Sequence, residues 1–304
     1  MFTLLHKVEQ AHEECVWTCS WGHNQETDQN YIVTGSLDNR VNIWNWNESE
    51  NLRQLHSIEG HQLGCISSDI NALGTRAVTS STDSMIKVWE LASGENVSSI
   101  DCRPMDSWTV RLSPDSSSLT TGSNSGKVNL FDAESGHSLL QLDTGGKFVL
   151  SVAFSPDGKT IAAASQEGIV YLFDLETQKL LTHMECHALP IRTLCFTGDS
   201  QTLITGSDDR YIKLYDTADK GGIVATLPGH TAWVLGIDVS PTASQFATCS
   251  ADQTVKIWDL GQRSTLHTFT EHSDQVWDLS YNGNGSRLVS ASEDKSVNVY
   301  AIPV

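Results

Sequence analysis

The sequence lacks long apolar stretches and paired cysteines. No run reaches 18 apolar residues, and the start of the chain has only the short apolar run Phe2 to Leu5, with no basic residues before it. We therefore expect no membrane-spanning segment, no secretory signal and no membrane partner. The seven cysteines are odd in number, scattered and without a CxxC pair, which is typical of a reducing compartment.

Basic residues are also scarce. The chain has 19 lysines and arginines against 37 aspartates and glutamates, a net charge of −18. The average field of such a protein repels phosphate backbones, so we expect no direct contact with nucleic acid. The hydrophobic fraction of 39% and the charged fraction of 18% are those of a folded globular protein.

What the sequence does contain is an internal repeat. Seven segments end in an aromatic residue after alternating apolar positions, as in Val-Asn-Ile-Trp44 and Val-Lys-Ile-Trp258. The seven aromatic residues stand 45, 42, 42, 42, 43 and 42 residues apart: Trp44, Trp89, Phe131, Phe173, Tyr215, Trp258 and Tyr300. A fixed period of about 40 to 45 residues is the mark of a β-propeller.

Two further marks accompany the aromatic residue. A histidine stands 28 residues before it in four repeats, and the first repeat places its own, His12, four residues earlier because Gly22 to Asn30 is a longer polar turn. A Ser-x-Asp triplet begins eight residues before the aromatic. The third and fourth repeats lack both the histidine, replaced by Arg103 and Gly145, and the aspartate.

These marks, Gly-His, Ser-x-Asp and Trp-Asp in this order, resemble WD40 repeats. The resemblance implies an all-β fold, a seven-bladed propeller of four-stranded blades around a channel, with residues 1–304 as a single domain. It also implies that histidine, aspartate, serine and tryptophan form one hydrogen-bonded network, because a buried imidazole needs polar partners. The predicted network residues are His61, Ser81, Asp83, Trp89, His187, Ser207, Asp209, His230, Ser250, Asp252, Trp258, His272, Ser292 and Asp294.

The ends of the chain predict how the ring closes. Each repeat spans the outer strand of one blade and the three inner strands of the next. The chain stops four residues after Tyr300, which leaves the seventh blade one strand short, while Leu4 to Glu9 forms a strand before His12. We predict that this N-terminal strand pairs with the C-terminal blade and covers its exposed edge.

Aromatic residues recur three and five residues after the histidine position, where propellers of this kind present partners with one channel mouth. Tryptophan and arginine are enriched at binding hot spots. The predicted partner-binding residues are Trp17, Trp108, Phe148, Arg192, Trp233 and Trp277. Asp106 occupies one of the same positions. The alternative is that each aromatic fills space between blades, the role we assign to Trp21 and Trp46.

Segments outside the shared pattern, such as residues 146–151 and 274–277, resemble the WD-repeat subunits of the superkiller complex. The resemblance implies a non-catalytic scaffold, a monomeric propeller within a hetero-complex, in nucleus and cytoplasm. In the superkiller complex its partners would be a tetratricopeptide scaffold and a helicase that feed messenger RNA to the exosome. In the polymerase-associated factor complex it would act in transcription elongation and histone modification.

Catalysis and metal binding are disfavoured. His183, Cys186, His187 and Cys195 superficially resemble a metal set, but His187 is the repeat histidine and Cys195 occupies an ordinary strand position. The sequence has no glycine-rich phosphate loop or nucleophile elbow. We therefore expect no catalytic residues, no metal and no cofactor.

Two other classes of WD40 scaffold have sequence features of their own. A G-protein β-like subunit would begin with a long helix, for which the segment before His12 has no room. Substrate receptors of cullin ubiquitin ligases often carry an arginine two residues after the Trp-Asp aspartate. Those positions hold Asn47, Ala92, Glu134, Glu176, Ala218, Gly261 and Pro303. A cullin receptor or another WD40 adaptor remains the alternative function.

Overall fold

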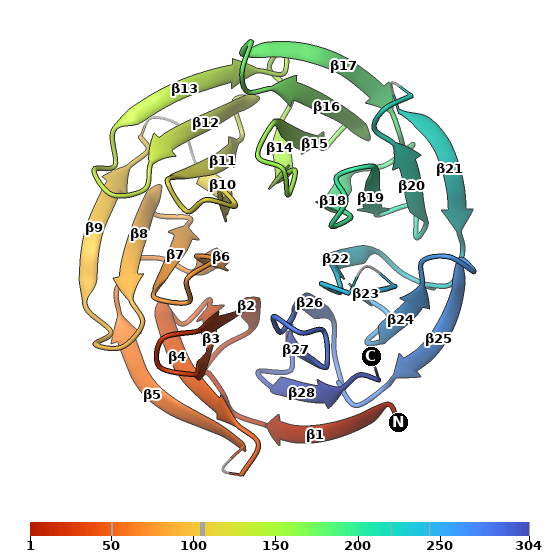
Figure 1. Ribbon diagram of the computed structural model, residues 1–304. Coiled ribbons are helices and arrows are strands. Elements are labelled where there is room, and N and C mark those ends of the chain that lie inside the picture. Colours follow the sequence, from red (N-terminus) through yellow and green to blue (C-terminus); the bar gives the residue numbers. More distant parts are fainter. Residues whose placement is uncertain (50, 104–106, 220, 243, 304) are drawn as a thin grey trace.

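The computed structural model describes residues 1–49, 51–103, 107–219, 221–242 and 244–303. Within these ranges the chain forms seven four-stranded antiparallel sheets, which are arranged as the blades of a closed ring around a central axis (Figure 1). The described residues contain no helix, and hence none that could cross a membrane. Asp106, named above with the predicted mouth residues, lies outside the described residues.

The first three blades follow one another along the chain. Blade 1 consists of β2 (Val16–Asn24), β3 (Gln29–Ser36), β4 (Arg40–Asn47) and β5 (Asn51–Glu59). Blade 2 consists of β6 (Cys65–Ile70), β7 (Arg76–Ser81), β8 (Met85–Glu90) and β9 (Asn96–Asp101). Blade 3 consists of β10 (Ser107–Leu112), β11 (Ser118–Ser123), β12 (Lys127–Asp132) and β13 (Ser138–Asp143).

The remaining blades repeat this order. Blade 4 consists of β14 (Val149–Phe154), β15 (Thr160–Ser165), β16 (Ile169–Asp174) and β17 (Lys179–Glu185). Blade 5 consists of β18 (Ile191–Phe196), β19 (Thr202–Ser207), β20 (Ile212–Asp216) and β21 (Gly222–Leu227). Blade 6 consists of β22 (Val234–Val239), β23 (Gln245–Ser250), β24 (Val255–Asp259) and β25 (Ser264–Phe269), and blade 7 of β26 (Val276–Tyr281), β27 (Arg287–Ser292), β28 (Val297–Ala301) and β1 (Thr3–Val8).

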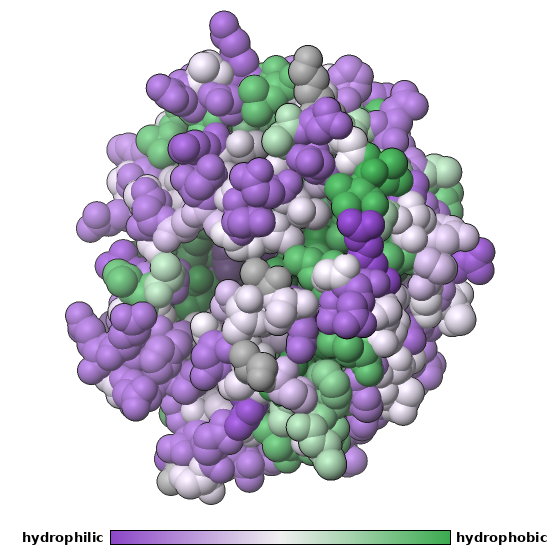
Figure 2. Space-filling view, turned by 45° about the vertical axis from the view of Figure 1, so that its right-hand side comes forward, coloured by the Kyte–Doolittle hydropathy of each residue, from purple (hydrophilic) through white to green (hydrophobic). Residues whose placement is uncertain are grey.

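The core is divided into clusters between neighbouring blades. The second strand of each blade is buried on both faces because it lies between two other blades, and β15 accordingly carries the small apolar run Ile161 to Ala164. Between blades 4 and 5, Ala162 and Leu172 pack against Ile191 and Leu203. The outermost strands face water and alternate in burial. On the face seen in Figure 2, hydrophilic and intermediate side chains cover most of the area, and the hydrophobic side chains gather in patches.

The predicted ring closure is confirmed. Strand β1 pairs antiparallel with β28, with Leu4 opposite Tyr300 and Val8 opposite Val297, and it forms the outer edge of the last blade. The N–H of Ala11 then donates to the carbonyl oxygen of Lys295 at 3.0 Å. The two ends of the chain lie close together (Figure 1).

The histidine network forms in the blades that carry its members. In blade 2, His61 Nδ1 lies 3.2 Å from Asp83 Oδ2, and His61 Nε2 lies 2.8 Å from Thr79 Oγ1. The indole N–H of Trp89 donates to the same threonine oxygen at 2.8 Å. Because an ionised carboxylate can only accept, Nδ1–H donates to Asp83, and Nε2 of the neutral ring accepts from the Thr79 hydroxyl. The Thr79 oxygen in turn accepts the indole N–H of Trp89.

The serine of the motif has another role than the one we predicted. Ser81 Oγ donates to the carbonyl oxygen of Leu63 at 2.8 Å and accepts the N–H of Asp83 at 3.1 Å, so it shapes the turn. The hydroxyl that joins histidine to tryptophan stands ten residues before the aromatic. This position holds Thr34, Thr79, Thr205, Thr248 and Ser290 in the blades with a histidine.

The other blades with a histidine repeat the histidine–aspartate and histidine–hydroxyl contacts, but in blade 5 the Tyr215 hydroxyl donates to the carbonyl oxygen of Cys186 instead of joining Thr205. The histidine–aspartate contacts are His12–Asp38, His187–Asp209, His230–Asp252 and His272–Asp294, at 2.8 to 3.1 Å. The turn serines Ser207, Ser250 and Ser292 accept the N–H of the aspartate two residues on. Trp258 N–H donates to Thr248, whereas in blade 7 Ser290 donates to the Tyr300 hydroxyl.

Burial and hydrogen bonding set the charges in this network. Burial lowers the pKa of His61 and of His187, which favours neutral imidazoles. Burial also acts to raise the pKa of Asp83, but the N–H groups of Gln62 and Met85, together with His61, outweigh it and lower the pKa. The aspartate therefore stays an anion that accepts from the turn and from the imidazole.

Candidate interaction site

One channel mouth is built from residues that bulge out of the innermost strands. In each inner strand the register with the next strand shifts around the second residue. A β-bulge re-aims the side chain of the extra residue. The second residues are Trp17, Ile66, Trp108, Leu150, Arg192, Leu235 and Trp277, which we call the collar.

Aromatic rings occupy one side of the collar. The ring centroids of Trp17 and Trp277 are 4.8 Å apart, and those of Trp17 and Trp108 are 6.5 Å apart. Phe148, which precedes β14, contacts Trp108 edge-on at 5.6 Å. All four side chains are half-buried. Residues from blades 7, 1, 3 and 4 therefore form one continuous aromatic surface.

The other side combines a tryptophan with a fixed guanidinium. Arg192 lies over the Trp233 ring, 5.4 Å from its centroid. Its Nε and Nη2 donate to the two carboxylate oxygens of Asp208, each at 2.9 Å. Trp233 is 46% exposed, the most open of the mouth tryptophans. The structure thus brings Arg192 and Trp233 together, across the mouth from the aromatic surface.

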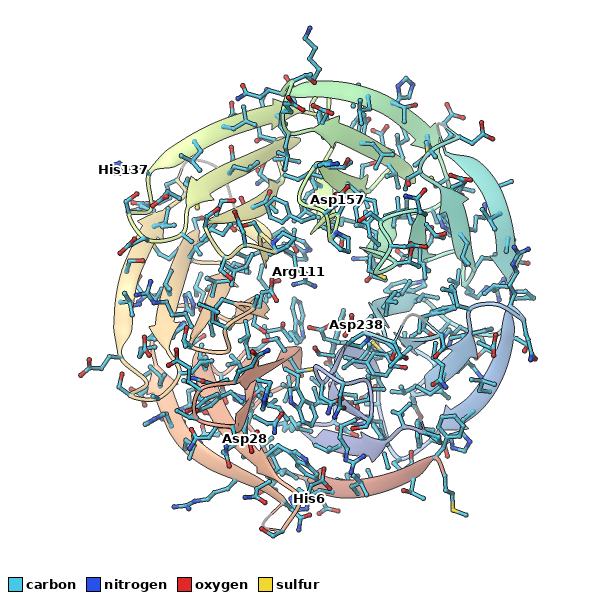
Figure 3. The ribbon with its side chains drawn as sticks, viewed as in Figure 1. His6, Asp28, Arg111, His137, Asp157 and Asp238 are labelled. Atoms are coloured by element: carbon cyan, nitrogen blue, oxygen red, sulfur yellow. The ribbon has the colours of Figure 1, made fainter. Side chains whose placement is uncertain are left out.

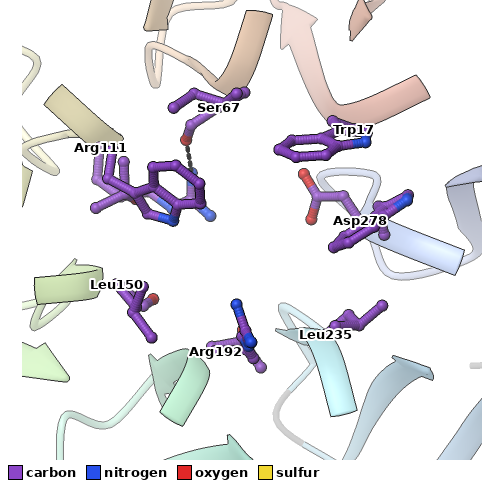
Figure 4. A pocket seen from close by; sticks show the side chains of 13 residues that line it. Trp17, Ser67, Arg111, Leu150, Arg192, Leu235 and Asp278 are labelled. Atoms are coloured by element: carbon purple, nitrogen blue, oxygen red, sulfur yellow. Dashed lines mark hydrogen bonds between the residues drawn. The ribbon is translucent and has the colours of Figure 1, made fainter. Parts of the chain in front are cut away.

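The collar surrounds a cavity of about 100 Å³, which is lined by all seven collar residues together with Arg111 and Asp278. Arg111 and Asp278 face each other across it (Figure 4). Arg111 Nη1 donates to the carbonyl oxygens of Ser68 and Val110 at 3.1 and 3.0 Å. Our sequence prediction missed Arg111 and Asp278; the available signal was a charged residue inside an otherwise apolar inner strand.

Three aspartates in the channel wall join neighbouring blades. Asp69 accepts the N–H of Leu112 at 2.8 Å and Asp238 that of Tyr281 at 2.7 Å. Asp278 accepts the N–H of Cys19 at 3.0 Å, across the junction of blades 7 and 1. These carboxylates help to hold the ring together.

The three channel aspartates interact with the same positive charge, that of Arg111. Arg111 and Asp238 lie beside the central opening (Figure 3). Burial raises the pKa of Asp238 to about 7, while the N–H groups of Tyr281 and Val239 and the charge of Arg111 act in the opposite direction. Burial also raises the pKa of Asp69 and of Asp278, again opposed by Arg111.

The six predicted partner-binding residues therefore gather at one mouth. Trp17, Trp108, Arg192 and Trp277 line the cavity there, while Phe148 and Trp233 flank it. The two tryptophans assigned to packing, Trp21 and Trp46, are 8% and 4% exposed and belong to the core cluster of blades 7 and 1.

Two of the residues that superficially resemble a metal site in the sequence, His187 and Cys186, have other surroundings in the structure. His187 is bonded through both ring nitrogens, to Asp209 and Thr205 at 2.8 Å each. Burial raises the pKa of the Cys186 thiol to about 11, which disfavours a thiolate. Among the described residues, no group of three or more histidine, cysteine, aspartate or glutamate side chains is arranged to hold a metal ion.

Comparison with protein families agrees with this architecture. The family model "WD domain, G-beta repeat" matches residues 3–45, 52–90, 221–259 and 263–300. The model "Nucleolar protein 10-like, N-terminal domain" matches residues 109–234. The chain therefore belongs to the WD40-repeat family of β-propellers.

Individual relatives define the resemblance further. Superkiller complex protein 8 of Dictyostelium discoideum is 47% identical over 303 residues, 99% of either chain. WD repeat-containing protein SL1-17 of Schistosoma mansoni is 48% identical over 114 residues, a match that spans only 38% of either chain. WD repeat-containing protein VIP3 of Arabidopsis thaliana is 34% identical over 115 residues.

Proposed function

We propose that this chain is a non-catalytic subunit of a superkiller-type complex and that it holds a segment of a partner protein at the collar. The observation that carries the proposal is the gathering of five half-buried or exposed aromatic rings and Arg192 at one channel mouth. Aromatic and arginine side chains dominate the binding energy of protein interfaces. The full-length similarity to superkiller complex protein 8 supports the choice of complex.

The geometry suggests how a partner segment would bind. An apolar side chain of the partner would pack on the aromatic surface of Trp17, Trp277 and Phe148, displacing water from it. Arg192 is held by Asp208 and keeps its Nη1 group for a carbonyl or carboxylate of the segment. Its planar guanidinium loses little freedom on binding because it is already positioned.

The partners that we propose in each compartment follow from the family resemblance. In the cytoplasm the partners would be the tetratricopeptide scaffold and the helicase of the superkiller complex, which acts in messenger RNA decay. In the nucleus they would be subunits of the polymerase-associated factor complex, which acts in transcription elongation. Partners would supply the RNA contacts, in line with the net charge of −18.

Affinity purification from cells tests the proposal. We expect the tagged full chain to recover the tetratricopeptide and helicase subunits, and the double variant F148A/W233A to lose them, since each hot-spot truncation removes about 2 kcal/mol of binding. The matched control is L181A/I223A, at side chains 57% and 59% exposed on β17 and β21. It should bind like the wild type.

Thermal unfolding of the wild type and of both double variants shows whether the substitutions affect the fold. Both double variants should melt near the wild-type temperature, because the substituted side chains are partly exposed. Recovery of polymerase-associated factor subunits would support the nuclear assignment. Recovery of cullin adaptors instead, or undiminished binding by F148A/W233A, would contradict the proposal and favour the substrate-receptor alternative.

A further inference from the structure

The channel mouth opposite the collar is shaped by blade 1. Strands β2 and β3 continue past the length of their counterparts through the pairs Gly22–Tyr31, His23–Asn30 and Asn24–Gln29. Strands β4 and β5 are extended in the same way, through the opposite pairs Trp46–Leu52 and Asn47–Asn51. Since β2 runs from Trp17 at the collar to Asn24, this extension projects from the other mouth.

The extension forms one wall of a cleft of about 1140 Å³, which we call the hairpin cleft. Its opposite walls come from the turns after β6, β22 and β26. A volume of this size exceeds what a single side chain needs and suits an extended polypeptide segment. The collar cavity is about 100 Å³ by comparison.

The wall is rigid because its members are bonded to one another. The indole rings of Trp21 and Trp46 meet edge-on, with centroids 6.1 Å apart. The indole N–H of Trp21 donates to Asn30 Oδ1 at 3.3 Å. Arg287 of blade 7 donates to both carboxylate oxygens of Glu48 at 2.9 Å, which ties the tip of blade 1 to its neighbour. The cleft is therefore built into the ring.

The charge of the cleft is acidic. The lining includes the carboxyl groups of Asp28, Glu48 and Asp238, and none of its described members is a lysine or arginine. Burial raises the pKa of Asp238 to about 7, so this group is only partly ionised at neutral pH. Glu48 is neutralised by Arg287, but the Asp28 carboxylate is 95% exposed, with only His23 nearby at 3.7 Å. Asp28 therefore presents a free negative charge at the entrance.

The neighbouring turns extend this charge. The turns after β10, β14 and β18 lie on the same face and carry Asp115, Asp157 and Asp199. A serine or threonine hydroxyl donates to each carboxylate at 2.5 to 2.6 Å and lowers its pKa, so each stays charged at neutral pH. A cationic segment leaving the cleft would pass along them.

One residue of the cleft wall packs into the core between blades 6 and 7. Tyr281, which is 5% exposed, lies among the lining residues, and its hydroxyl has no hydrogen-bond partner within the described part of the chain. A buried hydroxyl without a partner is unfavourable.

We propose that the hairpin cleft docks an extended, lysine- or arginine-bearing segment of a partner polypeptide. The acidic entrance attracts the basic side chains. The carboxamides of Asn45 and Asn47 line the cleft and bond within blade 1 through Asn45 Nδ2 and Asn47 Oδ1, which orients Asn45 Oδ1 and Asn47 Nδ2 as an acceptor and a donor for the segment's backbone. This site is separate from the collar and does not depend on the function proposed above. A single propeller would then hold two segments, one at each mouth.

Peptide binding to the purified full chain tests this site. The probe is a short fluorescein-labelled peptide of Gly-Lys-Ser repeats, and its counterpart carries glutamate in place of lysine. Fluorescence anisotropy should show binding of the lysine peptide that weakens with salt, and none of the glutamate peptide. The triple variant D28N/D115N/D157N should weaken the lysine peptide by about tenfold, because three charge pairs are lost.

The matched control removes three exposed carboxylates near the collar, as E9Q/E13Q/D274N. It should weaken binding less than about twofold. F148A/W233A should bind the peptide like the wild type. Hydrogen exchange should slow in residues 22–30 when the peptide is bound. Equal loss in the two triple variants, binding of the glutamate peptide, or protection at the collar instead would overturn the proposal.

Discussion

Replacing Thr79 by valine tests which hydroxyl joins the blade network. Valine keeps the shape of threonine but neither accepts from the Trp89 N–H nor donates to His61 Nε2, which lie at 2.8 Å from the Thr79 oxygen. Thr79 and Trp89 are 0% and 2% exposed, so water cannot replace the lost partner. The substitution therefore leaves one buried donor and one buried acceptor unsatisfied.

The magnitude follows from those two groups. Each buried polar atom left without a partner costs about 1–3 kcal/mol, so the two groups together should lower the free energy of unfolding of T79V by about 2–6 kcal/mol. For a chain of this size the melting temperature should fall by about 5 °C or more. Guanidinium denaturation monitored by tryptophan fluorescence measures the first quantity, and calorimetry measures the second.

A matched control lies one blade further on. Thr121 occupies the same strand position in blade 3, where Arg103 and Phe131 stand in place of the histidine and the tryptophan. T121V removes no such bridge and should destabilise the protein by less than about 1 kcal/mol. Equal destabilisation by T79V and T121V would refute the reasoning, because it would show that the hydroxyl matters for packing alone.

Two further predictions concern the ring as a whole. Because the pKa of Asp238 is raised to about 7 in the folded protein, above its ordinary value, the folded state binds this proton more tightly and stability declines as pH rises toward neutral. The difference between the free energies of unfolding of D238N and of the wild type, measured by urea denaturation, should therefore shift in favour of D238N as the pH rises from 5 to 8. A shift in favour of the wild type over this range would contradict the reasoning. Deleting residues 1–10 removes β1 from β28 and should lower the melting temperature by about 5 °C or more. An unchanged melting temperature would show that the ring does not need this strand.

The strand architecture could be predicted because its signals are local. Alternating apolar positions, turn residues and the spacing from Trp44 to Tyr300 recur within each repeat, and each repeat is one supersecondary unit. The position of the N-terminal strand followed from counting strands. The error in the network arose because Ser81 and Thr79 both lie close to the aromatic in sequence. Only the direction of each side chain distinguishes them.

The candidate site was predictable in part. The bulged position of Trp17, Arg192 and Trp277 recurs in every repeat, so one position per blade could be assigned to a mouth. Which rings touch could not be assigned, since Trp17 and Trp277 come from opposite ends of the chain and meet only where the ring closes.

The sequence by itself determined the repeat, the number of blades and the strand that closes the ring, since each depends on neighbours along the chain. The tertiary structure alone decided that Arg111 serves aspartates from three other blades, that Arg192 lies over Trp233, and that a longer hairpin in blade 1 makes a cleft with blades 2, 6 and 7. The physical reason is that these contacts cross the channel or the blade junctions. Their distances are set by how seven twisted sheets pack into a closed circle.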